Sequence, residues 1–244
     1  MNTTIRWVFL LALLGALIGL CWMLALAGKA GPDDALAGPW VRYGGRVALI
    51  AAALGAWFIT QKLIGSRPPL AEGTIGDLVH DLTASVNRWL HAHPRAANRL
   101  LIGSSFGIDV FGLTLIGAGL FGDTLRPFMA LLLLFFFRQV CQACCALPAP
   151  PGIIWRHPGA PTILVTYGVA NDFFISGHTA IAVLGALWAS AVLPWWAAVI
   201  AIVMAIGEAI TVLILRAHYT MDVLAAITAA WCAWALAGYI CVGF

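Results

Sequence analysis

Apolar segments long enough to cross a lipid bilayer dominate the pattern of hydrophobic and polar positions along the chain. A membrane-spanning helix needs about 20 predominantly apolar residues, and several stretches come close to that length. These stretches cover residues 7–27, 46–65, 99–121, 126–146, 177–193, 196–215 and 221–242. The pattern therefore predicts an all-α fold, a polytopic bundle of membrane helices.

The first of these stretches allows two interpretations. Arg6, the apolar run and the sequence Ala25-Leu26-Ala27 together resemble a signal peptide with its cleavage site. The apolar run is longer than the usual core of about 7–15 residues in such a peptide, so we favour an uncleaved helix. We accordingly expect an N-terminal span with its connector over residues 1–45 and one membrane domain over residues 46–244.

Residues 74–93 form a segment of a different kind. Apolar side chains recur there at helical spacing, with charged and polar residues between them. Thr74 followed by Asp77 suggests a capped start, and Pro94 suggests the stop. We predict an amphipathic helix in the membrane interface, which is either a gate for lipid entry or an ordinary connector. The histidines that we expect to be solvated in this segment are His80, His91 and His93.

The connection formed by residues 147–176 is long and shows no hydrophobic periodicity. Its first part, Leu147-Pro148-Ala149-Pro150-Pro151-Gly152, cannot continue a helix. Long loops without secondary structure of their own are commonly functional. We therefore expect this loop to contribute to a site, because it ends in a polar motif.

Composition supports a membrane protein and narrows its partners. Hydrophobic residues make up 62% of the chain and charged residues 9%, whereas a soluble domain averages about 25% charged residues. The formal net charge of +3 is modest and lies in the loops, which makes nucleic acid a poor candidate partner. The six cysteines lie in apolar stretches, and we expect buried thiols rather than a metal site, because no further ligand stands near Cys141-x-x-Cys144-Cys145.

Two polar motifs stand at the ends of predicted spans. They are Asn171-Asp172-Phe173-Phe174-Ile175-Ser176-Gly177-His178-Thr179 and Arg216-Ala217-His218-Tyr219-Thr220-Met221-Asp222-Val223. Two histidines and an aspartate are the residue types that a phosphohistidine cycle needs: a nucleophile, a group that orients it and a second acid or base. His218 and Asp222 are four residues apart, so a helix that begins near residue 218 would place them on one face. Asp222 would then accept a hydrogen bond from one imidazole nitrogen and leave the other free as a nucleophile.

Phosphate recognition can be assigned to residues beside both motifs. Gly177 permits close backbone approach, and unpaired amides at a helix start favour a phosphate. Arg138 and Arg216 flank the motifs, and a guanidinium group suits phosphate oxygens because it can bind two of them at once. The alternative is that each histidine is only a polar cap at the membrane interface. The carboxylates of Asp109 and Glu208 either line the cavity or form hydrogen bonds between helices.

The two motifs together resemble the signatures of a known family. Ser176-Gly177-His178-Thr179 and His218-Tyr219-Thr220-Met221-Asp222-Val223 look like those of the sphingomyelin synthase-like branch of the type 2 phosphatidic acid phosphatase (PAP2) superfamily. Residues 138–178 also resemble plant phosphatidylcholine:diacylglycerol cholinephosphotransferase. That second likeness rests on Leu147-Pro148, Trp155-Arg156-His157-Pro158-Gly159 and Asn171-Asp172-Phe173-Phe174. Together the resemblances cover roughly residues 46–242.

The resemblance implies a six-span PAP2-like core, with residues 7–27 as an additional span. It implies that His218 attacks phosphorus, that Asp222 orients His218, and that His178 protonates the leaving alkoxide and later deprotonates the acceptor. No metal ion or other cofactor is implied. The superfamily's Lys-x6-Arg-Pro motif is absent, so phosphate contacts are expected from the two flanking arginines. The further substrate-binding residues that we expect are Asn171, Asp172, Ser176, Gly177, Tyr219 and Trp155.

We therefore expect an enzyme that transfers phosphocholine or phosphoethanolamine from a glycerophospholipid to a lipid alcohol such as diacylglycerol or ceramide. The alternatives are a lipid phosphate phosphatase or phospholipase C-like hydrolase, in which water is the acceptor, and a non-enzymatic lipid-binding membrane protein. The composition, rich in Ala and Arg, favours a bacterial inner membrane. The positive-inside rule favours the cytoplasmic face for the motifs, whereas the resemblance implies the exoplasmic face, which we adopt.

Overall fold

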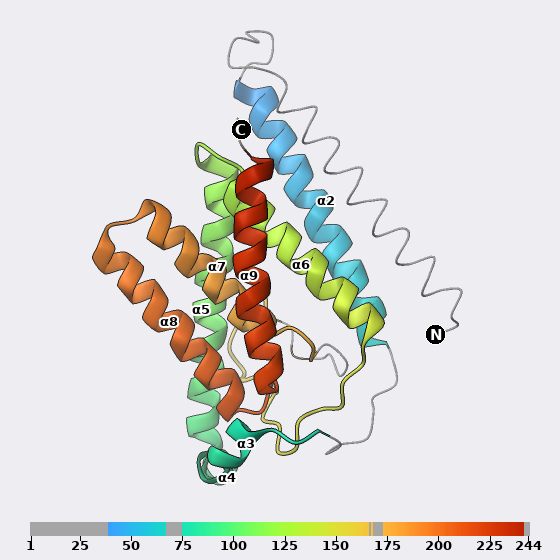
Figure 1. Ribbon diagram of the computed structural model, residues 1–244, viewed down its shortest axis with the longest axis vertical. Helices are drawn as coiled ribbons and strands as arrows, with labels where there is room; N and C mark the ends of the chain where they lie inside the picture. The colour runs from blue at the N-terminus through green and yellow to red at the C-terminus, as the bar shows by residue number, and fades with distance from the viewer. Residues whose placement is uncertain (1–38, 67–74, 166, 168–172, 242–244) are drawn as a thin grey trace.

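The computed structural model describes residues 39–66, 75–165, 167 and 173–241, and every regular element within them is an α-helix. The predicted span at residues 7–27 and the motif residues Asn171 and Asp172 lie outside the described residues. The helices are α2 (Pro39–Gly65), α3 (Leu78–Leu82), α4 (Ala84–Ala92), α5 (Pro94–Phe121), α6 (Arg126–Cys144), α7 (Gly177–Val192), α8 (Trp195–Ile214) and α9 (Thr220–Ile240). Figure 1 shows the long helices as a bundle, with α3 and α4 at one end of it.

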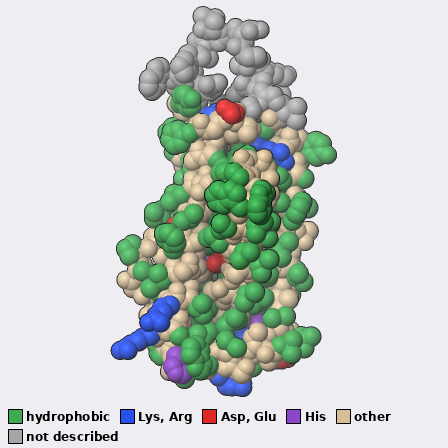
Figure 2. All heavy atoms as spheres, turned by 90° about the vertical axis from the view of Figure 1, so that its left-hand side faces the viewer, with side chains coloured by type: hydrophobic (Ala, Val, Ile, Leu, Met, Phe, Trp, Pro, Cys, Tyr) green, Lys and Arg blue, Asp and Glu red, His purple; other side chains and the backbone are tan. Residues whose placement is uncertain are grey.

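Five of the described helices, α2, α5, α6, α8 and α9, are long and apolar enough to cross a membrane. This agrees with the predicted membrane helix bundle. α7 has only 16 residues, fewer than the roughly 20 of a full span, so the six-span core stays a prediction. Figure 2 shows the face on the α8 side of the bundle, where hydrophobic side chains cover much of the middle and basic side chains gather near the lower end.

The short helix α7 packs against α5, α6, α8 and α9 and is therefore central to the bundle. Its close approach to α5 depends on a glycine, because a Cβ atom at Gly185 would lie 2.1 Å from Phe111 Cδ1. Helix α9, which packs against α6 and α7, buries a stripe of small side chains. The fully buried residues of this stripe are Ala226, Ala230, Ala233 and Ala237. Small residues let helix backbones approach closely, which is how membrane helices gain packing energy.

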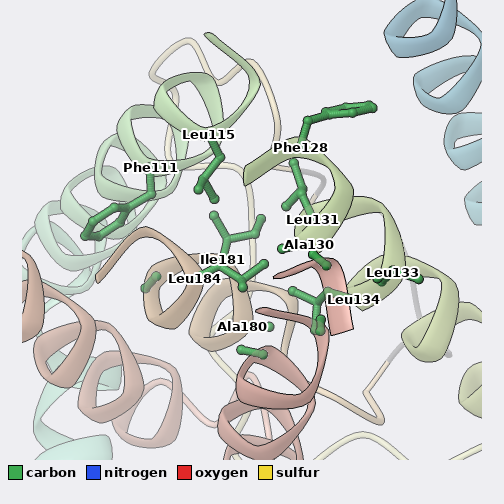
Figure 3. Packing of buried hydrophobic residues seen from close by; sticks show 14 of the residues in the cluster. Phe111, Leu115, Phe128, Ala130, Leu131, Leu133, Leu134, Ala180, Ile181 and Leu184 are labelled. Carbon is green, nitrogen blue, oxygen red and sulfur yellow. The ribbon is translucent and has the colours of Figure 1, made fainter. Parts of the chain in front are cut away.

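The main hydrophobic core lies where α5, α6 and α7 meet. Figure 3 shows side chains from these three helices pointing toward one another. Its members include Phe111 and Leu115 of α5, Leu134 of α6, and Ile181 and Leu184 of α7. The same three helices contribute walls to the cavity described below, so this packing fixes the position of the site.

The predicted interfacial helix consists of two short helices that meet at Thr83. The first begins after Asp77, whose Oδ1 accepts hydrogen bonds from the amides of Val79 and His80 at 3.0 and 3.2 Å. The second ends before Pro94, as predicted, and Pro94 opens α5. Both helices expose large apolar side chains, as an interfacial location requires. These side chains are Leu78, Leu82, Val86 and Trp89.

The prediction that the cysteines are buried is wrong for several of them. Cys144, Cys145 and Cys232 are exposed, Cys141 is half-buried, and Cys241 is buried. A membrane helix is apolar on its lipid-facing side as well as on its packed side. An apolar sequence context therefore does not distinguish a thiol in the core from a thiol facing lipid.

Candidate active site

A cavity of about 110 Å³ brings the two motifs together. His178 lines it from the first turn of α7, and His218 lines it from the turn between α8 and α9. Arg138 of α6, Gly177 at the start of α7 and Trp155 of the long loop also face this cavity, and their contact with substrate stays a prediction. The remaining walls are mainly apolar, so the polar groups are concentrated in one part of the cavity.

A backbone carbonyl orients the imidazole of His218. The Nδ1 atom lies 2.7 Å from the carbonyl oxygen of Phe173, whereas it lies 3.7 Å from Asp222 Oδ2. In the neutral imidazole, the Nδ1 proton is donated to the carbonyl, which leaves Nε2 unprotonated, as a nucleophile requires. Asp222 is close enough to stabilise a positive charge on His218, but it is not the hydrogen-bond acceptor that the spacing predicts.

Asp222 instead caps helix α9. It is the third residue of the helix, and its Oδ2 accepts a hydrogen bond from the Tyr219 amide at 2.9 Å. The side chain is fully buried, and its Oδ1 has no hydrogen-bond partner among the described residues. A carboxylate is stabilised at a helix N-terminus because the exposed amides carry partial positive charge. One residue therefore both starts the helix and places a negative charge beside His218.

Three consecutive carbonyls of the first motif each accept a hydrogen bond from a side chain of another element. The pairs are Phe173 with His218 Nδ1 at 2.7 Å, Phe174 with Gln142 Nε2 at 3.1 Å, and Ile175 with Arg138 Nε at 3.0 Å. Ile175 has a φ of 62°, a left-handed conformation that is a genuine outlier for a β-branched residue. The surrounding hydrogen bonds hold this strained turn directly before the first-motif histidine.

Ser176 joins the two motifs through its backbone amide and caps α7 through its side chain. Its amide donates to the carbonyl of Asp222 at 3.2 Å, and its Oγ accepts from the Thr179 amide at 3.3 Å as the N-cap of α7. Ser176 is fully buried and is not among the residues that face the cavity. Its position therefore fixes where α7 and its histidine begin relative to the second motif.

Arg138 lies against the start of α7. A Cβ atom built on Gly177 would lie 3.5 Å from Arg138 Nε, and Arg138 Nη1 donates to Gln61 Oε1 of α2 at 3.3 Å. The first amides of a helix and a guanidinium group both favour an anion. The two are adjacent at the polar end of the cavity, which makes this end suitable for a phosphate group.

His178 lies in the first turn of α7 beside Trp155, and one of its ring nitrogens has no partner among the described residues. Its ring meets Trp155 edge to face, with the ring centroids 4.9 Å apart. Its Nε2 is buried and has no hydrogen-bond partner among the described residues. A buried polar atom without a partner is costly, and a bound ligand that pairs with it would remove that cost.

The prediction that His80 is solvated is wrong. His80 is buried, its ring stacks on Tyr219, and its Nε2 lies 2.9 Å from the carbonyl oxygen of His218. Burial lowers the pKa of His80, so the neutral ring donates its Nε2 proton to that carbonyl at neutral pH. Tyr219 is fully buried beneath His80 and is not part of the cavity lining. His91 and His93 are exposed, as predicted.

Arg216 is placed outside the cavity lining. Its guanidinium group donates to the carbonyl of His80 and, at 3.4 Å, to the carbonyl of Pro151. The residue has a φ of 57°, so a second strained turn precedes His218. Arg216 therefore ties the interfacial helices and the long loop to the second motif, and its contact with phosphate stays a prediction.

The two intramembrane carboxylates form structural hydrogen bonds. Asp109 of α5 accepts from the amides of Ile163 and Leu164 at 3.0 and 2.8 Å, which anchors the long loop to the bundle. Glu208 of α8 accepts from the hydroxyl of Ser104 on α5. Neither carboxylate faces the cavity that holds the histidines. The structure therefore favours the alternative in which the two carboxylates form hydrogen bonds between packed elements.

A comparison with known families matches most of this chain. The family model AtPDCT1/2 matches residues 76–239, and the family corresponds to plant phosphatidylcholine:diacylglycerol cholinephosphotransferase. The matched part contains α3 to α8, most of α9, the long loop and both motifs, and it begins after α2. No curated protein and no solved structure matches the chain.

Proposed function

The chain belongs to the AtPDCT1/2 family, and from this premise we propose that it transfers a phospholipid headgroup, phosphocholine or phosphoethanolamine, from a glycerophospholipid to a lipid alcohol such as diacylglycerol or ceramide. One observation carries the proposal: the histidines of both motifs face one cavity together with Arg138, and the rest of the cavity is mainly apolar. A few convergent polar groups in an apolar pocket suit an amphipathic ligand with a charged head.

The proposed reaction runs in two steps through His218. In the first, His218 Nε2 attacks the donor phosphorus, the bond from phosphorus to the glycerol oxygen breaks, and His178 gives its proton to that oxygen. In the second, His178 removes the proton from the acceptor hydroxyl, whose oxygen attacks phosphorus and breaks the bond to His218. Asp222, 3.7 Å from His218 Nδ1, stabilises the positive charge on the ring during both steps.

The other site residues have supporting roles in this proposal. Arg138 and the first amides of α7 hold the phosphate oxygens, and Trp155 positions the ring of His178. Asn171 and Asp172 remain proposed substrate contacts on the strength of the resemblance. We also propose that the site faces the exoplasmic side of a bacterial inner membrane. Membership of the wider PAP2 superfamily is likewise part of the proposal.

Transfer requires that the intermediate meets a lipid hydroxyl before it meets water. Phe173 lines the cavity beside the histidines, and Phe173 and Ile175 are both buried, so the first motif presents apolar side chains and we expect a lipid alcohol to outcompete water. The test incubates purified protein with headgroup-labelled phosphatidylcholine, with and without diacylglycerol or ceramide. Label that appears in a new lipid supports transfer. Release of water-soluble phosphocholine at the same rate with every acceptor would identify a hydrolase, and unchanged lipid would identify a binding protein.

A carboxylate on the interfacial segment links it to the second motif. Asp77 accepts hydrogen bonds from the amide of Thr220 and, at 2.7 Å, from its hydroxyl. Burial is the largest single influence and would raise the pKa of Asp77, but the hydrogen bonds from Thr220 and from the His80 amide, together with the Coulombic interaction with His80, outweigh it and lower the pKa below its ordinary value. Because the folded-state pKa is lowered, the link contributes fully at neutral pH and is lost only as the pH falls through that lowered value.

We expect Asp77→Ala to lower the rate of headgroup transfer by about tenfold to a hundredfold, because small misplacements of a reacting group can have effects of that size. The matched control is Asp81→Ala, which removes an exposed carboxylate from α3, the helix that Asp77 caps, and should keep the wild-type rate. Both rates are measured with labelled phosphatidylcholine and saturating diacylglycerol. Equal rates for the two variants would contradict a positioning role for Asp77.

A further inference from the structure

The cavity continues well beyond the histidines along helix α6. The residues of α6 that line it run from Phe128 to Arg138, and Arg138 marks its polar end. These residues are ten positions apart on one helix, which corresponds to about 15 Å along the helix axis. The hydrocarbon core of a bilayer is about 30 Å thick, so the cavity extends over about the depth of one leaflet.

Helix α2 forms a wall of this cavity. The residues of α2 that face it lie on one side of the helix, and they are Ala53, Leu54, Trp57 and Gln61. α2 runs along the edge of the bundle beside α6 (Figure 1), where Trp57 meets Phe135 edge to face at 5.4 Å. α2 precedes the residues matched by the family model, so this chain has a cavity wall that the family match does not include.

The wall carries, between Gln61 and Ala53, a hydrogen-bond donor that no described residue satisfies. Trp57 Nε1 is buried and has no hydrogen-bond partner among the described residues. Trp57 stands one helical turn from Gln61 at the polar end and one turn from Ala53 at the apolar end. A ligand with a polar acceptor between a charged head and an apolar tail would satisfy this donor.

The space available suits one hydrocarbon chain. The cavity volume is about 110 Å³. A water molecule needs roughly 10–15 Å³ on this scale, so the space holds about seven to eleven water-sized groups, and a methylene is of comparable size. Apart from Arg138 at the polar end, the wall residues from α5 and α6 are apolar, and they include Ile116, Leu131 and Leu132.

We propose that the apolar part of the cavity, called the channel below, binds one acyl chain of the donor glycerophospholipid. Its walls include Ala53, Leu54, Trp57, Ile116, Leu131 and Leu132, and the wall formed by α2 selects for the length of that chain. Trp57 Nε1 donates to an ester carbonyl of the same lipid. The inference rests on the proposed function, because the donor phosphate must lie beside Arg138 and His218, and the channel begins there. We assign the channel to the donor and not to the acceptor because the donor phosphorus has to reach His218 in the first step. The acyl chains of the donor therefore lie closest to the entrance of the channel.

The first experiment measures occupancy without turnover. Phosphatidylcholine with a photoreactive diazirine near the end of one acyl chain is incorporated with the full-length protein into nanodiscs, irradiated, and the adducts are mapped by peptide mass spectrometry. We expect adducts on Leu131 and Leu132. Ala53→Trp should reduce them severalfold by filling the channel, whereas Ala52→Trp, an exposed neighbour on the same helix, should leave them unchanged.

The second experiment measures how turnover depends on chain length. Filling the channel with Ala53→Trp should slow long-chain phosphatidylcholine by at least about tenfold relative to a short-chain donor, because each lost methylene contact in a pocket has a large effect. Leu132→Trp tests the same space from α6 in case Ala53→Trp fails to fold. Trp57→Phe keeps an aromatic ring at this position but removes the Nε1 donor, and should raise KM for the phospholipid severalfold.

The outcomes separate this inference from the proposed function. Equal labelling of Leu131 and Leu132 in Ala53→Trp and Ala52→Trp overturns the channel, whatever the activity. If the wild-type protein shows no transfer activity but its labelling is still reduced by Ala53→Trp, the channel stands and the proposed function is overturned. If Ala53→Trp makes the rate depend on the chain length of the acceptor, and not on that of the donor, the assignment of the channel to the donor is overturned.

Discussion

His218→Ala is expected to abolish headgroup transfer, with kcat reduced by at least about 10⁴-fold, because removal of a nucleophile leaves only binding and electrostatic stabilisation. His218 suits this role through its environment. Its Nδ1 is held by the carbonyl of Phe173, its backbone carbonyl is held by His80, and the charge of Asp222 lies 3.7 Å from the ring. The loss should appear in kcat more than in KM, since the imidazole contributes to a bond that forms only during reaction.

Two measurements check this expectation. Headgroup transfer is assayed with labelled phosphatidylcholine, and the covalent intermediate is trapped at alkaline pH, where a phosphorus–nitrogen bond survives, and mapped by mass spectrometry. His93→Ala serves as the matched control, because it removes an exposed imidazole from the interfacial segment and should retain wild-type turnover. Normal turnover by His218→Ala, or an adduct mapped to another residue, would contradict the two-step mechanism.

The helices of this protein are predictable from sequence because the bilayer imposes a simple rule. A segment in hydrocarbon must be apolar and must satisfy its own backbone, so length and composition alone locate it. The predicted stretches 99–121 and 196–215 correspond to α5 and α8 with bounds that differ by a few residues. The prediction is less accurate for the interfacial segment. One helix is predicted there, but Thr83 separates two short helices, and the apolar periodicity continues through the break.

The candidate site was predictable in its residue types and much less in its contacts. Both histidines, Arg138 and Trp155 meet in one cavity, although they are separated by long stretches of sequence. The spacing rule paired His218 with Asp222, but a carboxylate at the third position of a helix also competes for its own N-cap amide. The carbonyl that orients His218 belongs to a loop backbone, and no side-chain pattern in the sequence reports where a backbone carbonyl will point.

Some of the residues that support the site are marked in the sequence and others are not. Gln61 and Gln142 are polar residues inside apolar spans, and such residues commonly mark contacts within the bundle. His80 had no comparable signal, because its amphipathic surroundings are equally typical of a solvated side chain. Its burial results from the tertiary contact with Tyr219 and the carbonyl of His218. Long-range contacts of this kind are set by how the interfacial helices dock onto the bundle.

Backbone strain at two positions is the feature that sequence reasoning was least able to anticipate. Ile175 and Arg216 both adopt positive φ, and neither is a glycine, an asparagine or an aspartate. Each precedes a motif histidine by two or three residues. The strain is offset by specific hydrogen bonds, from Arg138 to Ile175 and from Arg216 to the carbonyl of His80. The arginines thus help to hold the backbone turns that place the two imidazoles in one cavity.

The second large effect concerns His178, whose proposed role is proton transfer. His178→Gln should lower kcat for phospholipid by about 10²- to 10⁴-fold, the range expected when a general acid–base group is removed. Glutamine keeps a polar side chain beside Trp155, so packing in the cavity should change little. The measurement compares kcat and the melting temperature in detergent with those of the wild type, and a melting temperature within a few degrees would separate chemistry from folding.

A substrate whose leaving group needs no proton distinguishes the role of His178 from that of His218. Nitrophenolate leaves without protonation, so His178→Gln should still attack p-nitrophenyl phosphocholine and release a burst of nitrophenolate equal to the enzyme concentration. The burst should then stall, because the second step needs His178 to deprotonate the acceptor alcohol. His218→Ala should give no burst, since it lacks the attacking nitrogen. A His178→Gln variant that gives no burst, or that turns over phospholipid at the wild-type rate, would show that His178 does not transfer the proton in either step.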